Sequence, residues 1–320
     1  MNDPEPVFTD RWILQQRPPK NAVDPARPYA FLLEKERSLE GTVDDVLTIF
    51  LTNKECPFRC LMCDLWKNTT NEPVHRGAIP AQFRWALERA APAHHVKLYN
   101  AGSFFDPQAI ASEEYPEIAR LAAPFKTVIV ESHPRMIGRR CMRFNKMVEG
   151  KLQVAMGLET VHPEVLPRLN KQMTLEQFAH AARVLGASRI PVRAFMLLRP
   201  PFLSEAEGVF WTKRSIDYAF DSGVECCVIV PVRNGNGAME ILAADGLFES
   251  PSLDSLEEVL EYGIEQGRGR VFADLWDVES WVRNATSAQQ RIERLGRMNH
   301  SQSMEPLLMA QSEIRTTWKA

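Results

Sequence analysis

The segment Glu55-Cys56-Pro57-Phe58-Arg59-Cys60-Leu61-Met62-Cys63-Asp64-Leu65-Trp66 carries three of the chain's six cysteines within eight residues. Their spacing is C-x3-C-x2-C. Thiolates are soft ligands that favour iron–sulfur clusters or zinc. The segment therefore predicts a metal centre, with Cys56, Cys60 and Cys63 as its ligands.

Composition and charge narrow the class of protein. The chain has 320 residues, enough for one large α/β barrel or two domains. The net charge of −3 and the lack of a strongly basic stretch give no sign of a nucleic-acid surface. No apolar run approaches the roughly 20 residues that cross a bilayer, and the polar start of the chain is no secretory signal. We expect a cytoplasmic protein without membrane contact, in which cysteines stay reduced.

Six apolar runs predict parallel strands that are buried on both faces. They are Val46–Thr52, Val96–Asn100, Lys126–Glu131, Leu152–Leu158, Val192–Leu198 and Cys226–Val232. Helical patterns lie between them, and capping boxes open two of these helices at Thr174 and Ser204. This alternation predicts an α/β fold, a partial (β/α)6 TIM-like barrel, with the cysteines directly after its first strand.

Three parts of the chain are expected. Residues 1–40 are rich in proline and predict an extended N-terminal arm. Residues 41–235 hold the barrel core. Residues 236–320 predict a mainly helical C-terminal cap, with one apolar stripe along Leu256, Val259, Leu260 and Ile264.

Two kinds of metal centre fit the three cysteines. A four-iron cluster with three protein ligands keeps one iron free to bind a cofactor. A structural zinc site would need a fourth ligand, for which the nearest candidates are His75, His94 and His95. No second cysteine pair completes a zinc module, so the spacing favours a [4Fe–4S] cluster.

The cysteine motif after the first strand of such a barrel resembles the radical S-adenosylmethionine superfamily. Within it, the region from about Pro28 to Ser255 resembles the branch of the Elongator catalytic subunit and the archaeosine-synthesis radical enzymes. The resemblance implies that S-adenosylmethionine binds the free iron. One electron, from a reducing partner such as flavodoxin or ferredoxin, then cleaves its sulfonium to give a 5′-deoxyadenosyl radical.

Strand ends carry the other motifs of this resemblance, and chemistry in such barrels sits at the carboxyl ends of strands. The second strand ends in the place of the superfamily's glycine-rich motif, which holds the amino group of S-adenosylmethionine; its residues here are Asn100, Ala101, Gly102 and Ser103. A plain turn is the alternative.

Two glutamates close the third and fourth strands, and each needs a partner if it is buried. Glu131 and Glu159 are expected to meet the cofactor, as is Arg193 in the fifth strand. The alternative is an internal ion-pair network of these three residues. Met62 stands where the superfamily often places an aromatic residue against adenine, although simple packing explains it equally well.

The substrate is not identified by these motifs, and no catalytic residue is assigned. The slightly acidic chain has no recognisable RNA-binding module, which favours a small molecule, a cofactor precursor or a peptide over tRNA. A tRNA-modifying enzyme remains the alternative. A non-catalytic iron–sulfur or zinc scaffold, or a sensor, is the second alternative.

Overall fold

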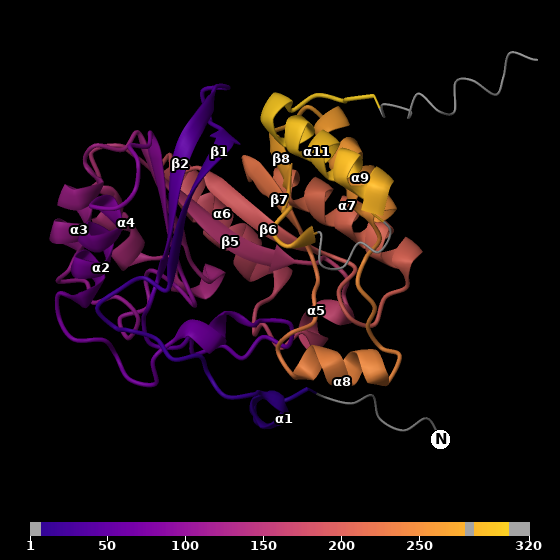
Figure 1. Ribbon diagram of the computed structural model, residues 1–320, viewed down its shortest axis with the longest axis horizontal. Coiled ribbons are helices and arrows are strands. Elements are labelled where there is room, and N and C mark those ends of the chain that lie inside the picture. Colours follow the sequence, from indigo (N-terminus) through magenta and orange to yellow (C-terminus); the bar gives the residue numbers. More distant parts are fainter. Residues whose placement is uncertain (1–7, 279–284, 307–320) are drawn as a thin grey trace, which may run out of the picture.

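One sheet of eight strands forms the frame of the molecule (Figure 1), in a computed structural model that describes residues 8–278 and 285–306. The strands lie side by side in chain order: β1 (Ala30–Arg37), β2 (Val43–Leu51), β3 (His95–Asn100), β4 (Thr127–Glu131), β5 (Lys151–Glu159), β6 (Val192–Leu198), β7 (Cys226–Pro231) and β8 (Arg270–Ala273). β1 is antiparallel to β2, and all later pairs are parallel. This curled sheet with helices outside is a partial TIM-like barrel, so the predicted fold class is confirmed.

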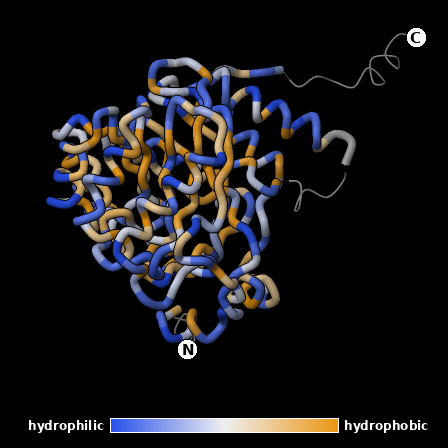
Figure 2. The backbone as a smooth tube through the Cα atoms, turned by 60° about the vertical axis from the view of Figure 1, so that its left-hand side comes forward, coloured by the Kyte–Doolittle hydropathy of each residue, from blue (hydrophilic) through white to orange (hydrophobic). Residues whose placement is uncertain are grey.

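Side chains alternate between the two faces of the sheet. On β7, Cys227 and Ile229 belong to the main core between the sheet and the helices. Cys226 and Val228 point the other way, into the barrel, where they pack with Phe272. The two cysteines thus lie on opposite faces of one strand. Figure 2 shows the hydrophobic strands gathered inside a more hydrophilic periphery.

Helices follow most strands and cover the outer face. They are α1 (Asp10–Gln16), α2 (Ala78–Leu87), α3 (Tyr115–Ala122), α4 (Arg139–Asn145), α5 (Val165–Arg168), α6 (Leu175–Ala187), α7 (Glu205–Asp221), α8 (Ala238–Ala244), α9 (Leu253–Glu265) and α11 (Ala285–Ser301), with 3-10 turns η1 (Leu65–Asn68) and η2 (Pro134–Met136). Both predicted capping boxes are present, at Thr174 of α6 and Ser204 of α7. In the described ranges, no helix is long and apolar enough to cross a membrane.

Two strands were not among the six predicted. β1 lies in the predicted arm, at the edge of the sheet, and it was missed because its second half, residues 34–37, consists of charged residues alone and leaves an apolar run of only four residues. β8 lies in the predicted cap and has only four residues, too few for a periodic signal. The division into arm, core and cap stays a prediction, with one strand of the sheet in each outer part.

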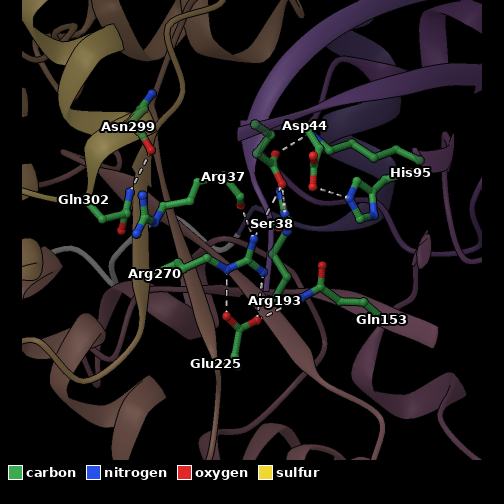
Figure 3. Close-up of polar contacts among 12 residues, drawn as sticks. Arg37, Ser38, Asp44, His95, Gln153, Arg193, Glu225, Arg270, Asn299 and Gln302 are labelled. Carbon is green, nitrogen blue, oxygen red and sulfur yellow. Dashed lines mark hydrogen bonds and ion pairs between the residues drawn. The ribbon is translucent and has the colours of Figure 1, made fainter. Parts of the chain in front are cut away.

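The free edge of β8 is covered by side chains of the last described helix. The Asn299 amide accepts a hydrogen bond from Ala273 N (2.9 Å) and donates one to Ala273 O (2.9 Å). Gln302, just beyond α11, does the same with Val271 N (2.7 Å) and O (2.8 Å). Figure 3 shows both amides beside the strand. They replace the backbone of a ninth strand.

Charged residues fill the barrel interior at the amino-terminal end of the parallel strands. Glu36 of β1 forms ion pairs with Arg193 and with Lys97 (2.6 Å). These two cations hold the pKa of the buried Glu36 carboxyl far below its usual range, against the opposing effect of burial. Arg270 pairs with Glu225 (2.7 Å) in the same layer (Figure 3). The interior charges at this end are therefore neutralised by one another.

Replacing Glu36 with Gln should destabilise the fold by about 3–5 kcal/mol, because Arg193 then stays buried without its carboxylate. The free energy of urea unfolding measures this loss. The loss should shrink as the pH falls below 4.5, because the Glu36 carboxyl then takes up a proton in the unfolded chain but, with its low pKa, not in the folded one. The control is Glu88→Gln, which removes an exposed pair with Arg89 and should cost less than about 1 kcal/mol. Equal losses in both variants would contradict a stabilising role for the buried network.

Candidate functional site

The three cysteines lie in one closed loop at the carboxyl end of β2, here called the cysteine loop (residues 53–70). Its two ends are joined by hydrogen bonds from Thr70 N to Asn53 O (3.0 Å) and from Glu55 N to Thr70 O (3.1 Å). Cys56, Cys60 and Cys63 are half-buried free thiols. The loop thus presents three thiols where strand-end chemistry is expected.

One side chain of the loop itself and one from a distant segment hold carbonyl groups of this loop. Trp66 Nε1 donates to Cys63 O (3.0 Å). Asn236 Nδ2 donates to Leu61 O (2.8 Å) and Cys63 O (3.1 Å), while its Oδ1 accepts from Met239 N (2.8 Å) at the start of α8. One amide therefore fixes the cysteine loop to a helix that lies far away in the sequence.

Two of the histidines that were candidates for a fourth zinc ligand lie far from the cysteine loop. His94 and His95 lie at the start of β3, the opposite end of the sheet from the cysteine loop, and His95 faces Asp44 (3.2 Å). Across residues 8–278 and 285–306, no three His, Cys, Asp or Glu side chains converge on a single metal ion. Each cysteine of a four-iron cluster binds a different iron, so its thiolates need not meet at one point.

The end of β3 touches the cysteine loop. A Cβ atom added to Gly102 would lie 3.2 Å from Cys56 Cβ and 3.4 Å from Cys56 Cα, so only glycine fits without displacement. Ala101 and Ser103 beside it are buried. Ser103 Oγ accepts a hydrogen bond from His133 N (2.7 Å). The structure thus brings the predicted glycine motif and the first cysteine together.

Asn100 and Glu131 bring polar groups to the strand ends beside the contact between Gly102 and Cys56. Asn100 is 1% exposed, yet neither Oδ1 nor Nδ2 of its side chain has a hydrogen-bond partner. Its backbone N donates to Glu131 Oε2 (3.3 Å). Burial raises the pKa of Glu131 to about 8, although this hydrogen bond opposes the shift. Buried groups that lack partners are costly, and such groups beside a metal-ligand loop are suited to receive a polar ligand.

Glu159 has a protein partner instead. It forms a buried ion pair with Lys171 in the loop after α5. β5 carries a bulge between Gly157 and Glu159, and Glu159 has a positive φ of 66°. The pair forms part of the surroundings of Cys60, whose thiol is influenced by both charges.

Arg193 and Met62 do not join these residues. Arg193 is the second residue of β6 and pairs with Glu36 at the far end of the barrel, so it does not lie with Glu131 and Glu159, and the alternative of an ion-pair network among the three does not form. The reason is position, because Arg193 begins its strand whereas the two glutamates end theirs. Met62 packs against a buried apolar cluster that includes Leu61, Leu169 and Met239, in agreement with the packing alternative.

Two functional candidates were missed by sequence reasoning. Lys171 has no local motif, since its partner Glu159 lies 12 residues away and its neighbours Asn170 and Gln172 have positive φ angles of 51° and 56°. Asn236 lies in an Asn-Gly repeat that predicts only a turn. Lys171 and Asn236 could not be found from local sequence, because each is tied to the site by contacts with residues elsewhere in the chain.

Comparisons with known proteins show which proteins the chain resembles. No protein-family model matches the chain. It is 28% identical over 240 residues to the archaeosine synthase subunit beta of Methanosarcina acetivorans, which covers 69% of this chain and 68% of that protein. The subunit of the same name from Thermococcus kodakarensis is 31% identical over 166 residues, or 49% of this chain and 51% of that one.

Two solved structures share the fold. The archaeal Methanocaldococcus infernus Elp3 matches with a TM-score of 0.50 at 14% identity, over 68% of this chain and 57% of that one. Streptococcus suis SuiB bound to S-adenosylmethionine matches with a TM-score of 0.50 at 12% identity, over 70% and 49%. The matched region thus spans about half the length of each solved chain. The chain has the fold of the radical S-adenosylmethionine enzymes, and the predicted resemblance to their archaeosine-synthesis branch is confirmed.

Proposed function

We propose that this chain is an enzyme that binds a [4Fe–4S] cluster and S-adenosylmethionine and cleaves the cofactor reductively. One observation carries the proposal, namely that Gly102 lies against Cys56 while the side chain of Asn100, two residues earlier, is buried without a partner. A three-thiol loop beside unsatisfied polar groups suits a metal centre with a polar organic cofactor.

The side chains and backbone at this site are suited to hold a [4Fe–4S] cluster and S-adenosylmethionine. Cys56, Cys60 and Cys63 would hold the cluster, because soft thiolates are its usual ligands. The Asn100 amide, the Glu131 carboxyl and the backbone of Ala101 to Ser103 would receive the polar groups of S-adenosylmethionine. When bound, the two cofactors supply one-electron cleavage of a sulfonium, the source of a 5′-deoxyadenosyl radical.

The chain's own residues would hold the cysteine loop in place and orient the bound cofactor. Asn236 and Trp66 fix the backbone of the cysteine loop, so the thiols are held before any metal binds. The carboxyl of Glu131 holds its proton near neutral pH, since burial raises its pKa to about 8. It can therefore donate a hydrogen bond as well as accept one. A flavodoxin- or ferredoxin-type partner would supply the electron.

Anaerobic reconstitution of the wild-type chain should give a brown protein with about four irons, which releases 5′-deoxyadenosine with dithionite and S-adenosylmethionine. Replacing Cys56, Cys60 or Cys63 with Ala should abolish both the cluster and the release. The matched control is Cys141→Ala, because Cys141 is a buried thiol of α4 outside the cysteine loop. A colourless zinc protein, or an intact cluster in a triad variant, would contradict the ligand assignment. A full cluster without 5′-deoxyadenosine would favour the sensor or scaffold instead.

Gly102→Ala should lower the rate of 5′-deoxyadenosine release on the order of tenfold, since a displacement well under an ångström already misplaces reacting groups. The new methyl group would lie 3.2 Å from Cys56 Cβ and push the two segments apart. The control is Gly186→Ala in α6, where an added Cβ meets nothing within 4 Å. Unchanged release in Gly102→Ala would show that the contact does not position the cofactor.

A second candidate function is modification of a tRNA base, favoured by the sequence similarity to the archaeosine synthase beta subunits. The net charge of −3 argues for a small molecule, a cofactor precursor or a peptide instead. Retention of the chain on a column of immobilised tRNA distinguishes these two candidate functions. We expect no retention of the chain at about 150 mM salt. Retention there that disappears as the salt concentration rises would support tRNA.

A further inference from the structure

We propose that the exposed cations of η2 and α4, here called the basic patch, dock a small acidic electron-carrier protein that reduces the cluster. The basic patch consists of Arg135, Arg139, Arg140, Arg143 and Lys146. This inference rests on the proposed function, because it requires a cluster at the cysteine loop that takes up an electron from outside.

The basic patch is a local excess of positive charge. Its five cations lie between Glu131 and Glu149, and no acidic residue stands among them. All five side chains are exposed. The expectation that the chain has no strongly basic stretch is therefore wrong for this segment, which the net charge of −3 conceals because it sums over the whole chain.

The packing of α4 turns its cations to one side. Cys141 and Phe144 of this helix are 0% exposed and belong to the main core. Arg139, Arg143 and Lys146 follow one another at intervals of four and three residues, so they share the side that faces away from the core. Like charges at these intervals repel one another.

Neutralising partners are missing from the basic patch, although the neighbouring helices have them. α4 lies beside α3 (Figure 1). There Glu117 of α3 pairs with Arg120 (2.7 Å) and with Arg84 of α2 (2.8 Å). In the part of the chain that the structure describes, no carboxylate forms an ion pair with a cation of the basic patch. Such uncompensated charge suits a surface whose partner brings the negative charge.

The basic patch begins at the cysteine loop. The Arg135 guanidinium lies 5.8 Å from the centroid of the Phe58 ring. The same ring stacks on His133 at 3.7 Å between centroids. In the sequence, Phe58 stands midway between Cys56 and Cys60. A protein bound to the basic patch would therefore lie next to the cysteine loop.

These features favour an electron carrier over RNA. Electron-transfer complexes have small interfaces, and complementary charge steers their formation, so a patch on one short helix is enough. RNA recognition usually adds aromatic side chains that stack on bases, but Phe144, the one aromatic ring of α4, is buried. The negative net charge also opposes a phosphate backbone. One electron would leave the reduced carrier, which is thereby oxidised, and reduce the cluster.

The test compares two reductants on the reconstituted wild type and on the patch variant Arg139→Gln/Arg143→Gln/Lys146→Gln. With a reduced acidic flavodoxin or ferredoxin, the apparent KM for the carrier should rise about tenfold in the variant at unchanged kcat, because the lost charge slows encounter. With saturating dithionite, both chains should release 5′-deoxyadenosine at the same rate. Added salt should raise the KM of the wild type more than that of the variant.

The matched control is Arg84→Gln/Arg89→Gln/Arg120→Gln. It also removes three exposed cations, but each of these has a carboxylate partner. The KM for the carrier should stay at the wild-type value. Both triple variants should keep the iron content of the wild type, because all six replaced side chains are exposed.

The outcomes separate the two proposals. A wild type that releases no 5′-deoxyadenosine with dithionite would overturn the proposed function and this inference with it. Normal release with dithionite, but equal KM values for the carrier in the wild type and the patch variant, would overturn the inference alone. So would release that neither carrier can drive. Retention of the wild type on immobilised tRNA at about 150 mM salt, lost in the patch variant, would assign the basic patch to RNA instead.

Discussion

The contact between Gly102 and Cys56 is the constraint on which the candidate site depends. The register of β2 and β3 pairs Leu51 with Asn100, so the two strands end side by side and their following loops must share one small space. Only the missing side chain at position 102 lets the loops meet. Asn100 and Glu131 then border the cysteine loop, because each belongs to a strand end fixed by the same register.

The two ends of the barrel differ in whether their buried charged and polar side chains are paired with one another. At the amino-terminal end, Glu36 forms ion pairs with both Arg193 and Lys97, and Nε of Arg193 is left without a hydrogen-bond partner. At the carboxyl end, the Asn100 amide has no partner and Glu131 accepts a single hydrogen bond from the backbone. Unsatisfied groups cost stability, and natural chains accept this cost mainly at functional sites. The carboxyl end, where the Asn100 side chain makes no hydrogen bond at all, is therefore the better candidate for a ligand site.

Much of the fold could be predicted from local patterns. Continuous apolar runs gave β2 to β7, and the capping boxes at Thr174 and Ser204 gave the starts of α6 and α7. The cysteine spacing and the strand-end positions of Gly102 and Glu131 predicted residues that lie together in the structure. Arg193 was grouped with them because the sequence shows that a residue is in a strand but not which end its partner occupies. Lys171 was missed because its role arises from hydrogen bonds between loops far apart in the chain.

The paired amides of Asn299 and Gln302 have a consequence outside the active region. The unpaired backbone groups of an open strand edge can pair with a strand of another molecule, and such pairing is a common origin of aggregation. On β8 two amide side chains occupy these backbone groups, and each of them both donates and accepts a hydrogen bond, as a peptide group does. The solubility of the folded chain at this edge therefore depends on two amide side chains rather than on a strand, a loop or a charged rim.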